Sequence, residues 1–285
     1  MFKNLFGNEG GAAPLDVKKR FEMFGKNTQG SMSKVSPVRE RATGKMYCLK
    51  LLDKEKTARF EERFTGLKKP AEGAISVALH HRNLVESFEH GLTTEGEAFL
   101  LMELIDGYGL NFLIENHADK LDTRRVNVLL QMSDGLAYIH AQGYVHRDVC
   151  PRNMMVTKKG ILKHIDFGLS IPFKPEFCRP GNRTGTADYL APEVVKRQTT
   201  DQRVDLFALG VSAFELLTGG LPWEKASSGQ HLMKTQPGKN PREFKPDLDD
   251  LTVEFLNKAI EREPARRFQT AQDFHAAASR LPRTL

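Results

Sequence analysis

Up to about residue 103 the chain alternates short apolar stretches with polar turns, a pattern typical of β-strands. Residues 42–45 (Ala-Thr-Gly-Lys) predict a hairpin turn, and residues 46–52 predict the strand that follows it. Another strand is predicted at residues 98–103. A charged stretch at residues 60–80 interrupts the pattern, and Pro70 near its middle predicts the start of a helix.

Beyond residue 109 the apolar residues recur with helical spacing. The predicted helices are residues 124–142, 204–217, 251–260 and 271–281. The second of these is apolar on nearly every side, so we expect it to be buried. Residues 225–241 are rich in Ser, Gly, Gln, Lys and Asn and predict an exposed loop or insertion, and residues 8–16 predict a flexible segment.

Strands followed by helices predict an α+β fold with two lobes. We place a flexible lead-in at residues 1–17 and one folded module at residues 18–282. Within it we expect a small antiparallel-sheet lobe with one helix (residues 18–103), a hinge (residues 104–109) and a larger, mainly helical lobe (residues 110–282). Loops between Tyr144 and Pro192 would face the cleft between the lobes.

Composition narrows the class of protein. The chain has 285 residues, of which 40% are hydrophobic and 27% charged, as in an ordinary globular protein with a sizeable core. Its net charge of +6 is spread along the chain without a dense basic run, so nucleic-acid binding is not expected. Three scattered cysteines (Cys48, Cys150 and Cys178) suit a reducing compartment. No apolar run approaches the roughly 18 residues of a membrane span, so a cytoplasmic location is expected.

Two short motifs carry the candidate chemistry. The first is His146-Arg147-Asp148, followed five residues after the aspartate by Asn153. The second is Asp166-Phe167-Gly168. Asp148 can orient an attacking hydroxyl, while Asn153 and Asp166 offer the oxygen ligands that Mg²⁺ prefers. Phosphoryl transfer needs both functions close together.

On these motifs the sequence resembles the protein kinase family. The resemblance implies a two-lobed protein-kinase-like fold, ATP and Mg²⁺ as cofactors, and catalysis by Asp148 with Asn153 and Asp166 on the metal. It also implies that Lys50 binds the α- and β-phosphates and pairs with Glu72. An ordinary surface ion pair is the alternative for those two residues. Further nucleotide contacts are implied at four positions: Met102, Glu103, Ile105 and Met155.

The glycine-rich loop departs from the family pattern. Counting back fifteen residues from Lys50 gives Val35, which matches the family's adenine-packing valine. The three glycine positions are then Thr28, Gly30 and Ser33, of which one is glycine. Side chains there should stiffen or reshape a loop whose amides must approach phosphate closely.

A second departure lies two residues after Asp148, where Ser/Thr kinases usually place a lysine and this chain has Cys150. Some tyrosine kinases use an arginine four residues after the aspartate, and Arg152 holds that position. Arg152 is therefore our candidate for the missing cation. The alternative is that Arg152 simply faces solvent or substrate.

The segment of residues 185–193 (Gly-Thr-Ala-Asp-Tyr-Leu-Ala-Pro-Glu) resembles the docking loop of Ser/Thr kinases and implies a protein substrate. The resemblance implies that Thr186 hydrogen-bonds near Asp148 and that Glu193 pairs with Arg267. It also implies that Asp205 and Gly210 lie on the helix that anchors the catalytic loop.

Regulation is expected from an activating kinase or a regulatory partner. Thr184 is the nearest candidate phosphosite to Arg147, and Ser170 is the second. Ser76 stands four residues after Glu72, where kinases favour a bulky apolar side chain; either Val77 fills that place or the packing there is loose. Basophilic kinases carry acidic side chains where this chain has Arg152 and Gly109, so acidic or neutral substrates are expected.

The alternative function is a pseudokinase that serves as a binding or scaffold protein. Thr28, Ser33, Cys150 and Ser76 favour it. Catalytic activity is favoured by the presence of all five family residues, listed here in order: Lys50, Glu72, Asp148, Asn153 and Asp166.

Overall fold

The computed structural model describes residues 13–25, 28–30, 32–181, 183–224 and 238–283. Most of the predicted loop at 225–241 and the first twelve residues of the predicted lead-in lie outside this part. The described chain divides into two compact units. The first runs up to His80 and includes Val85–Ile105, and the second holds His81–Leu84 and everything from Asp106 onward. The predicted hinge at residues 104–109 spans the later of these boundaries.

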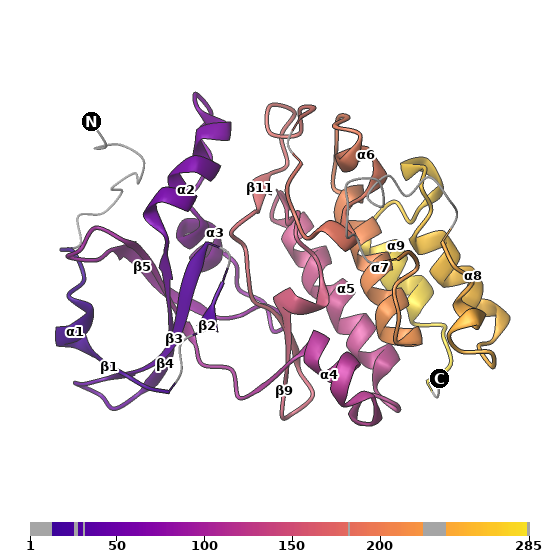
Figure 1. Ribbon diagram of the computed structural model, residues 1–285, viewed down its shortest axis with the longest axis horizontal. Coiled ribbons are helices and arrows are strands. Elements are labelled where there is room, and N and C mark those ends of the chain that lie inside the picture. Colours follow the sequence, from indigo (N-terminus) through magenta and orange to yellow (C-terminus); the bar gives the residue numbers. More distant parts are fainter. Residues whose placement is uncertain (1–12, 26–27, 31, 182, 225–237, 284–285) are drawn as a thin grey trace. The chain divides into compact units, whose positions relative to one another are not determined.

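The first unit is built on an antiparallel sheet (indigo to purple in Figure 1). Its strands are β1 (Phe21–Met23), β2 (Thr28–Gln29), β3 (Ser33–Glu40), β4 (Met46–Leu52), β5 (Ser87–Leu92) and β6 (Ala98–Glu103). They pair in the order β1-β3-β4-β6-β5, with β2 on β3. The predicted hairpin turn joins β3 to β4, and Gly44 in it adopts the left-handed φ of 72° that favours glycine.

Alternate residues of these strands form a core that also includes the end of the predicted lead-in. Phe21, Val38, Leu49 and Leu101 are at most 2% exposed, and Leu15 packs against the same cluster. The amide of Leu15 donates to the carbonyl of Leu92, and its carbonyl accepts from the amide of Thr94, both at 2.9 Å. Residue 15 is therefore held as part of the first unit.

The first unit also contains α1 (Val17–Arg20), α2 (Lys54–Glu61) and α3 (Glu72–Ala78). The helix predicted after Pro70 is present as α3. An additional helix, α2, begins earlier in the chain, because the Asp53 carboxylate accepts the amide of Lys56 and caps it. α3 packs on β5 at Gly73, where an added Cβ would lie 2.5 Å from the His90 side chain.

The second unit is mainly helical, with α4 (Leu110–Asn116), α5 (Arg125–Ala141), α6 (Pro192–Val195), α7 (Arg203–Thr218), α8 (Asp250–Ala259) and α9 (Ala271–Ala278). The predictions of α5, α7, α8 and α9 are confirmed within a few residues at each end. α7 is buried over almost its whole length, as its apolar composition predicts. Gly210 on α7 allows α8 to approach, since an added Cβ would lie 2.4 Å from the Ala259 carbonyl oxygen.

Short strands in the second unit position its loops. β7 (Gly107–Gly109), β9 (Met154–Thr157) and β10 (Leu162–His164) form one antiparallel sheet in the order β10-β9-β7. β8 (Tyr144–Val145) pairs with β11 (Ile171–Pro172). An antiparallel sheet in the first unit and a mainly helical second unit confirm the predicted α+β class. No helix of the described residues has the length and apolar character needed to span a membrane.

Candidate active site

In the first unit, Lys50 and Glu72 form a buried ion pair. Lys50 lies on β4 and Glu72 is the first residue of α3. The Lys50 Nζ lies 2.6 Å from Glu72 Oε1, and the two side chains are only 6% and 9% exposed. A buried charge is costly unless it is paired, so each group fixes the other in position. This burial does not fit the ordinary surface ion pair considered above.

The loop of the predicted glycine positions is a tight β2–β3 hairpin. Thr28 lies opposite Val35, and Val35 lies opposite Lys50 on the next strand. The Gly30 amide donates to the Ser33 carbonyl at 2.8 Å, and an added Cβ at residue 30 would lie 3.1 Å from Ser33 Oγ. Ser33 itself is buried, while Val35 is half-buried. The one retained glycine thus stands where an added Cβ would be in tight contact with Ser33.

The remaining predicted nucleotide contacts lie at the ends of two strands. Met102 is buried on β6, and Ile105, the last residue of the first unit, is half-buried. The Glu103 carboxylate accepts a hydrogen bond from the backbone amide of Glu86 at 2.8 Å, which holds this side chain against a residue of the first unit. Met155 is half-buried on β9 of the second unit.

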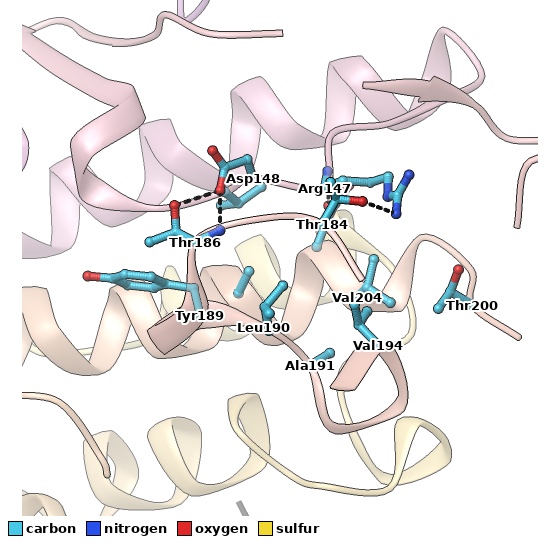
Figure 2. A pocket seen from close by; sticks show the side chains of 13 residues that line it. Arg147, Asp148, Thr184, Thr186, Tyr189, Leu190, Ala191, Val194, Thr200 and Val204 are labelled. Carbon is cyan, nitrogen blue, oxygen red and sulfur yellow. Dashed lines mark hydrogen bonds between the residues drawn. The ribbon is translucent and has the colours of Figure 1, made fainter. Parts of the chain in front are cut away.

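In the second unit, Asp148 is the centre of a hydrogen-bond network (Figure 2). Its Oδ1 accepts from both the amide and the hydroxyl of Thr186, each at 2.7 Å. Its Oδ2 accepts from Asn153 Nδ2 at 2.7 Å, and its backbone carbonyl accepts from the same nitrogen at 2.9 Å. The predicted proximity of Thr186 to Asp148 is confirmed. Three bonds to the two oxygens fix the orientation of the carboxylate.

Asp205 on α7 holds the backbone of the catalytic loop. Its carboxylate accepts the amides of His146 and Arg147, both at 2.7 Å, and lies 2.9 Å from His140 Nε2. Burial alone would raise the pKa of Asp205, but the hydrogen bonds from His140 and the loop amide hold it below its usual range. Arg147 is held with a left-handed φ of 69°, a strained conformation for a residue with a side chain. The anchoring predicted for Asp205 is confirmed, whereas sequence gave no signal for His140.

Asn153 and Asp166 come together through the backbone. The Ile165 amide donates to the Asn153 carbonyl at 3.0 Å, which brings Asp166, the next residue, beside the catalytic loop. One Asp166 oxygen accepts the Gly168 amide at 2.9 Å. Because the side-chain NH₂ group of Asn153 donates to Asp148, the side-chain oxygen of Asn153 (Oδ1) is the atom that could bind a cation. One carboxylate and one amide oxygen, completed by phosphate oxygens, form a donor set that fits Mg²⁺.

The two altered positions beside Asp148 have opposite surroundings. Cys150 is fully buried, with its Sγ 3.6 Å from Thr186 Oγ1. Burial, together with the charge of Asp148, raises the pKa of the Cys150 thiol to about 12, so it stays protonated and neutral. Arg152, in the 3-10 helix Pro151–Asn153, is exposed. Of these two residues, only Arg152 can supply a positive charge.

The docking segment is anchored by a second buried ion pair. Arg267 Nη1 and Nη2 donate to the two Glu193 oxygens at 2.7 and 2.8 Å, which confirms the predicted pairing. Gly185 adopts a φ of 124°, and an added Cβ there would lie 2.6 Å from the Arg147 carbonyl oxygen. The Tyr189 hydroxyl donates to Glu215 on α7, a contact that the sequence analysis did not anticipate. Figure 2 shows the side chains that line a small pocket at this segment. The cavity volume of about 20 Å³ suits a water molecule.

The candidate regulatory residues differ in accessibility. Thr184 is half-buried, and its Oγ1 accepts from Arg147 Nη2 at 2.7 Å. Ser170 is fully buried and its hydroxyl points to the His146 carbonyl, so we retain only Thr184 as a proposed phosphosite. Ser76 is fully buried and Val77 half-buried, which places the serine on the inward face of α3. Its hydroxyl has no hydrogen-bond partner among the described atoms.

Comparison with known proteins adds an independent line of observation. The sequence model of the protein kinase domain matches residues 21–277. An aurora kinase from Saccharomyces cerevisiae is 32% identical over 240 residues, which cover 83% of this chain and 64% of the relative. The serine/threonine-protein kinase pkn3 of Myxococcus xanthus is 28% identical over 267 residues, covering 87% of this chain and 47% of the relative.

A third relative, the probable serine/threonine-protein kinase PknB of Corynebacterium glutamicum, is 29% identical over 283 residues. The match covers 94% of this chain and 43% of that protein. The chain thus spans between 43% and 64% of the length of these three relatives.

Proposed function

The chain belongs to the protein kinase family, and on this premise we propose that it transfers the γ-phosphoryl group of ATP to Ser or Thr hydroxyls of protein substrates. The observation that carries the proposal is the hydrogen-bond network of Asp148. Its carboxylate offers about four acceptor directions, and Thr186 and Asn153 use three of them. A substrate hydroxyl would take the remaining direction.

Asp148 would then orient the hydroxyl and accept its proton as the phosphoryl group transfers. Transfer of this kind demands little covalent chemistry from the protein, so positioning and charge neutralisation supply most of the rate. The fixed carboxylate serves the first of these needs. Exposed Arg152, with its planar guanidinium, would serve the second by contacting two phosphate oxygens.

Lys50 would bind the α- and β-phosphates. A lysine ammonium on a flexible stem needs a fixed partner, and the 2.6 Å contact with buried Glu72 supplies one. Asn153 and Asp166 would hold Mg²⁺, which neutralises charge on the phosphates when bound. The β2–β3 hairpin with Thr28, Gly30, Ser33 and Val35, and the strand-end residues Met102, Glu103, Ile105 and Met155, are proposed to contact the nucleotide.

The docking segment supports Ser/Thr protein substrates. Glu193, Arg267 and Asp205 anchor this segment and the catalytic loop to buried parts of the second unit. An activating kinase acting on Thr184 is proposed as the regulator, because a phosphate there would meet the Arg147 guanidinium that already contacts the hydroxyl. The three cysteines are free thiols, which supports a reducing compartment such as the cytoplasm.

The scaffold alternative is not favoured. A binding protein has no need to maintain the buried Lys50–Glu72 ion pair, which is costly to bury. It also has no need for the hydrogen bonds that orient the Asp148 carboxylate, whereas both features serve phosphoryl transfer.

A thermal-shift measurement with ATP tests the proposal. Bound nucleotide at a hundred times its Kd should stabilise the protein by about 2.7 kcal/mol, and only when Mg²⁺ is present. Asp166→Asn should lose the Mg²⁺ dependence, while Arg280→Ser, a change at an exposed position in the turn that follows α9, should keep it. A wild-type shift that is absent, or indifferent to Mg²⁺, would contradict the proposal.

A further inference from the structure

Four exposed cations flank the docking segment. Arg179 and Arg183 precede it, and Lys196 and Arg197 follow it. We call these four residues the basic rim. The segment between them includes Thr186, which bonds directly to Asp148. The rim therefore borders, along the chain, the residues that would lie beside the acceptor hydroxyl.

A backbone hydrogen bond joins the segment that carries Arg179 to the segment that carries Lys196 and Arg197. The Thr200 amide donates to the Cys178 carbonyl at 3.1 Å. Arg179, the residue after Cys178, therefore lies near the segment of residues 196–200. The Arg197 amide donates to the Val194 carbonyl at 3.1 Å, which ends α6 in a tight turn. Arg179, Lys196 and Arg197 are thus exposed residues on two segments that this backbone hydrogen bond joins.

Two carboxylates near the rim in sequence, Glu193 and Asp201, are engaged elsewhere. Glu193 is buried against Arg267. Asp201 accepts hydrogen bonds from three nitrogens of Arg203, the backbone N, Nε and Nη2, the shortest at 2.7 Å. Among the described residues, none of the four rim cations forms an ion pair. Unpaired like charges on one surface repel each other and are relieved by an anionic partner.

We propose that the basic rim recognises Asp and Glu side chains that flank the acceptor residue of the protein substrate. The inference rests on the proposed kinase function and names its substrate class. Arginine forks match the carboxylate geometry, and a positive surface raises both the encounter rate and the affinity of acidic segments. Substrates with basic flanks meet like charge at the same place and are disfavoured.

Peptide turnover tests this inference. Three peptides share one serine acceptor, flanked by Glu, by Gln or by Lys. The rim variant combines Arg179→Ser, Lys196→Ser and Arg197→Asn; asparagine is chosen because residue 197 has a left-handed φ of 57°. The control variant combines Arg266→Ser, Arg280→Ser and Arg283→Asn, which removes the same three charges from exposed positions near the C-terminus.

Wild type should phosphorylate the Glu peptide with a kcat/KM roughly tenfold above that of the Gln peptide, mainly through a lower KM. The rim variant should lose this advantage and keep the Gln-peptide rate, and the control variant should keep both. The advantage should also shrink as salt rises. Equal kcat/KM for the Glu and Gln peptides in wild type would overturn the inference, as would an equal loss in the control variant.

Direct binding separates this inference from the proposed function. If no peptide is phosphorylated, the kinase proposal fails, yet fluorescence anisotropy of the labelled peptides still measures rim recognition. Tighter binding of the Glu peptide to wild type and to the control variant, but not to the rim variant, supports the inference. Equal affinity for the Glu and Gln peptides refutes it.

Discussion

The buried Glu193–Arg267 ion pair gives the sharpest stability prediction. Arg267 makes two bonds to Glu193 and donates to three backbone carbonyls, those of Glu261, Arg203 and Arg262, at 2.6, 3.1 and 2.8 Å. The Arg267 side chain is 0% exposed and that of Glu193 is 8% exposed. Arg267→Met fills a similar volume but removes all of these bonds and leaves a buried carboxylate without its cation.

Breaking a buried pair in this way costs about 3–5 kcal/mol. That is a large part of the roughly 5–15 kcal/mol that stabilises a typical domain. The matched control is Arg203→Met, because the Arg203–Asp201 pair has side chains 30% and 36% exposed. A half-exposed pair contributes about 1 kcal/mol or less, so the control should be mild.

Urea unfolding followed by tryptophan fluorescence is the assay. The chain has one tryptophan, and Trp223 stacks on Phe207 in the same unit as the ion pair. Its signal therefore reports the unfolding of that unit. Combining Arg267→Met with Glu193→Leu should cost less than the sum of the single changes, since no charge is left unpaired. If Arg267→Met costs no more than Arg203→Met, the account of this pair is wrong.

Three further predictions concern other residues. Burial is the main cause, and the charge of His146 the second, that lowers the pKa of His164 to about 3. The His164 imidazole therefore binds a proton less readily in the folded state than in the unfolded state, where its pKa is near the usual 6.5. Stability should therefore be full above pH 6.5 and be lower by about 1.4 kcal/mol at pH 5.5, and His164→Gln should remove that part of the pH dependence in urea titrations. Lys69→Met should destabilise the first unit by about 2–3 kcal/mol in thermal unfolding, because the Lys69 ammonium pairs with Glu61 at 2.9 Å and lies over two phenylalanine rings at 5.4 and 5.7 Å; Lys69→Arg should retain most of the stability. Arg152→Ala should lower kcat about tenfold, equivalent to about 1.4 kcal/mol, while Arg152→Lys keeps the charge and loses less; an unchanged kcat would remove Arg152 from the phosphate-binding role.

Contacts that the motifs encode could be predicted from the sequence. The pairing of Glu193 with Arg267 joins residues 74 apart, and no local pattern reveals it. The family resemblance supplied that link, as it did for Thr186 with Asp148. Helical spacing predicted α5, because a long run with period 3.6 has few alternative explanations. A long segment that is apolar on nearly every side predicted α7 as a buried helix.

What could not be predicted depends on packing between distant residues. Leu15 lies in a polar, glycine-rich context, yet it completes a core built from strands that follow it. Ser170 immediately precedes β11 and was a candidate phosphosite, yet it is fully buried. His140 contacts Asp205 across 65 residues, with no motif to mark it. Burial of single residues depends on the tertiary fold, which local sequence patterns do not carry.

The most direct test of the central claim is the intact mass of the protein after incubation with Mg²⁺ and ATP, alone and with a Ser-containing protein substrate. Wild type should add increments of about 80 Da, one per phosphoryl group, to itself or to the substrate. Asp148→Asn keeps the shape of the side chain but not its charge and should add none. Increments of equal extent in both proteins, or in neither, would contradict the assignment of Asp148 as the catalytic carboxylate of an active kinase.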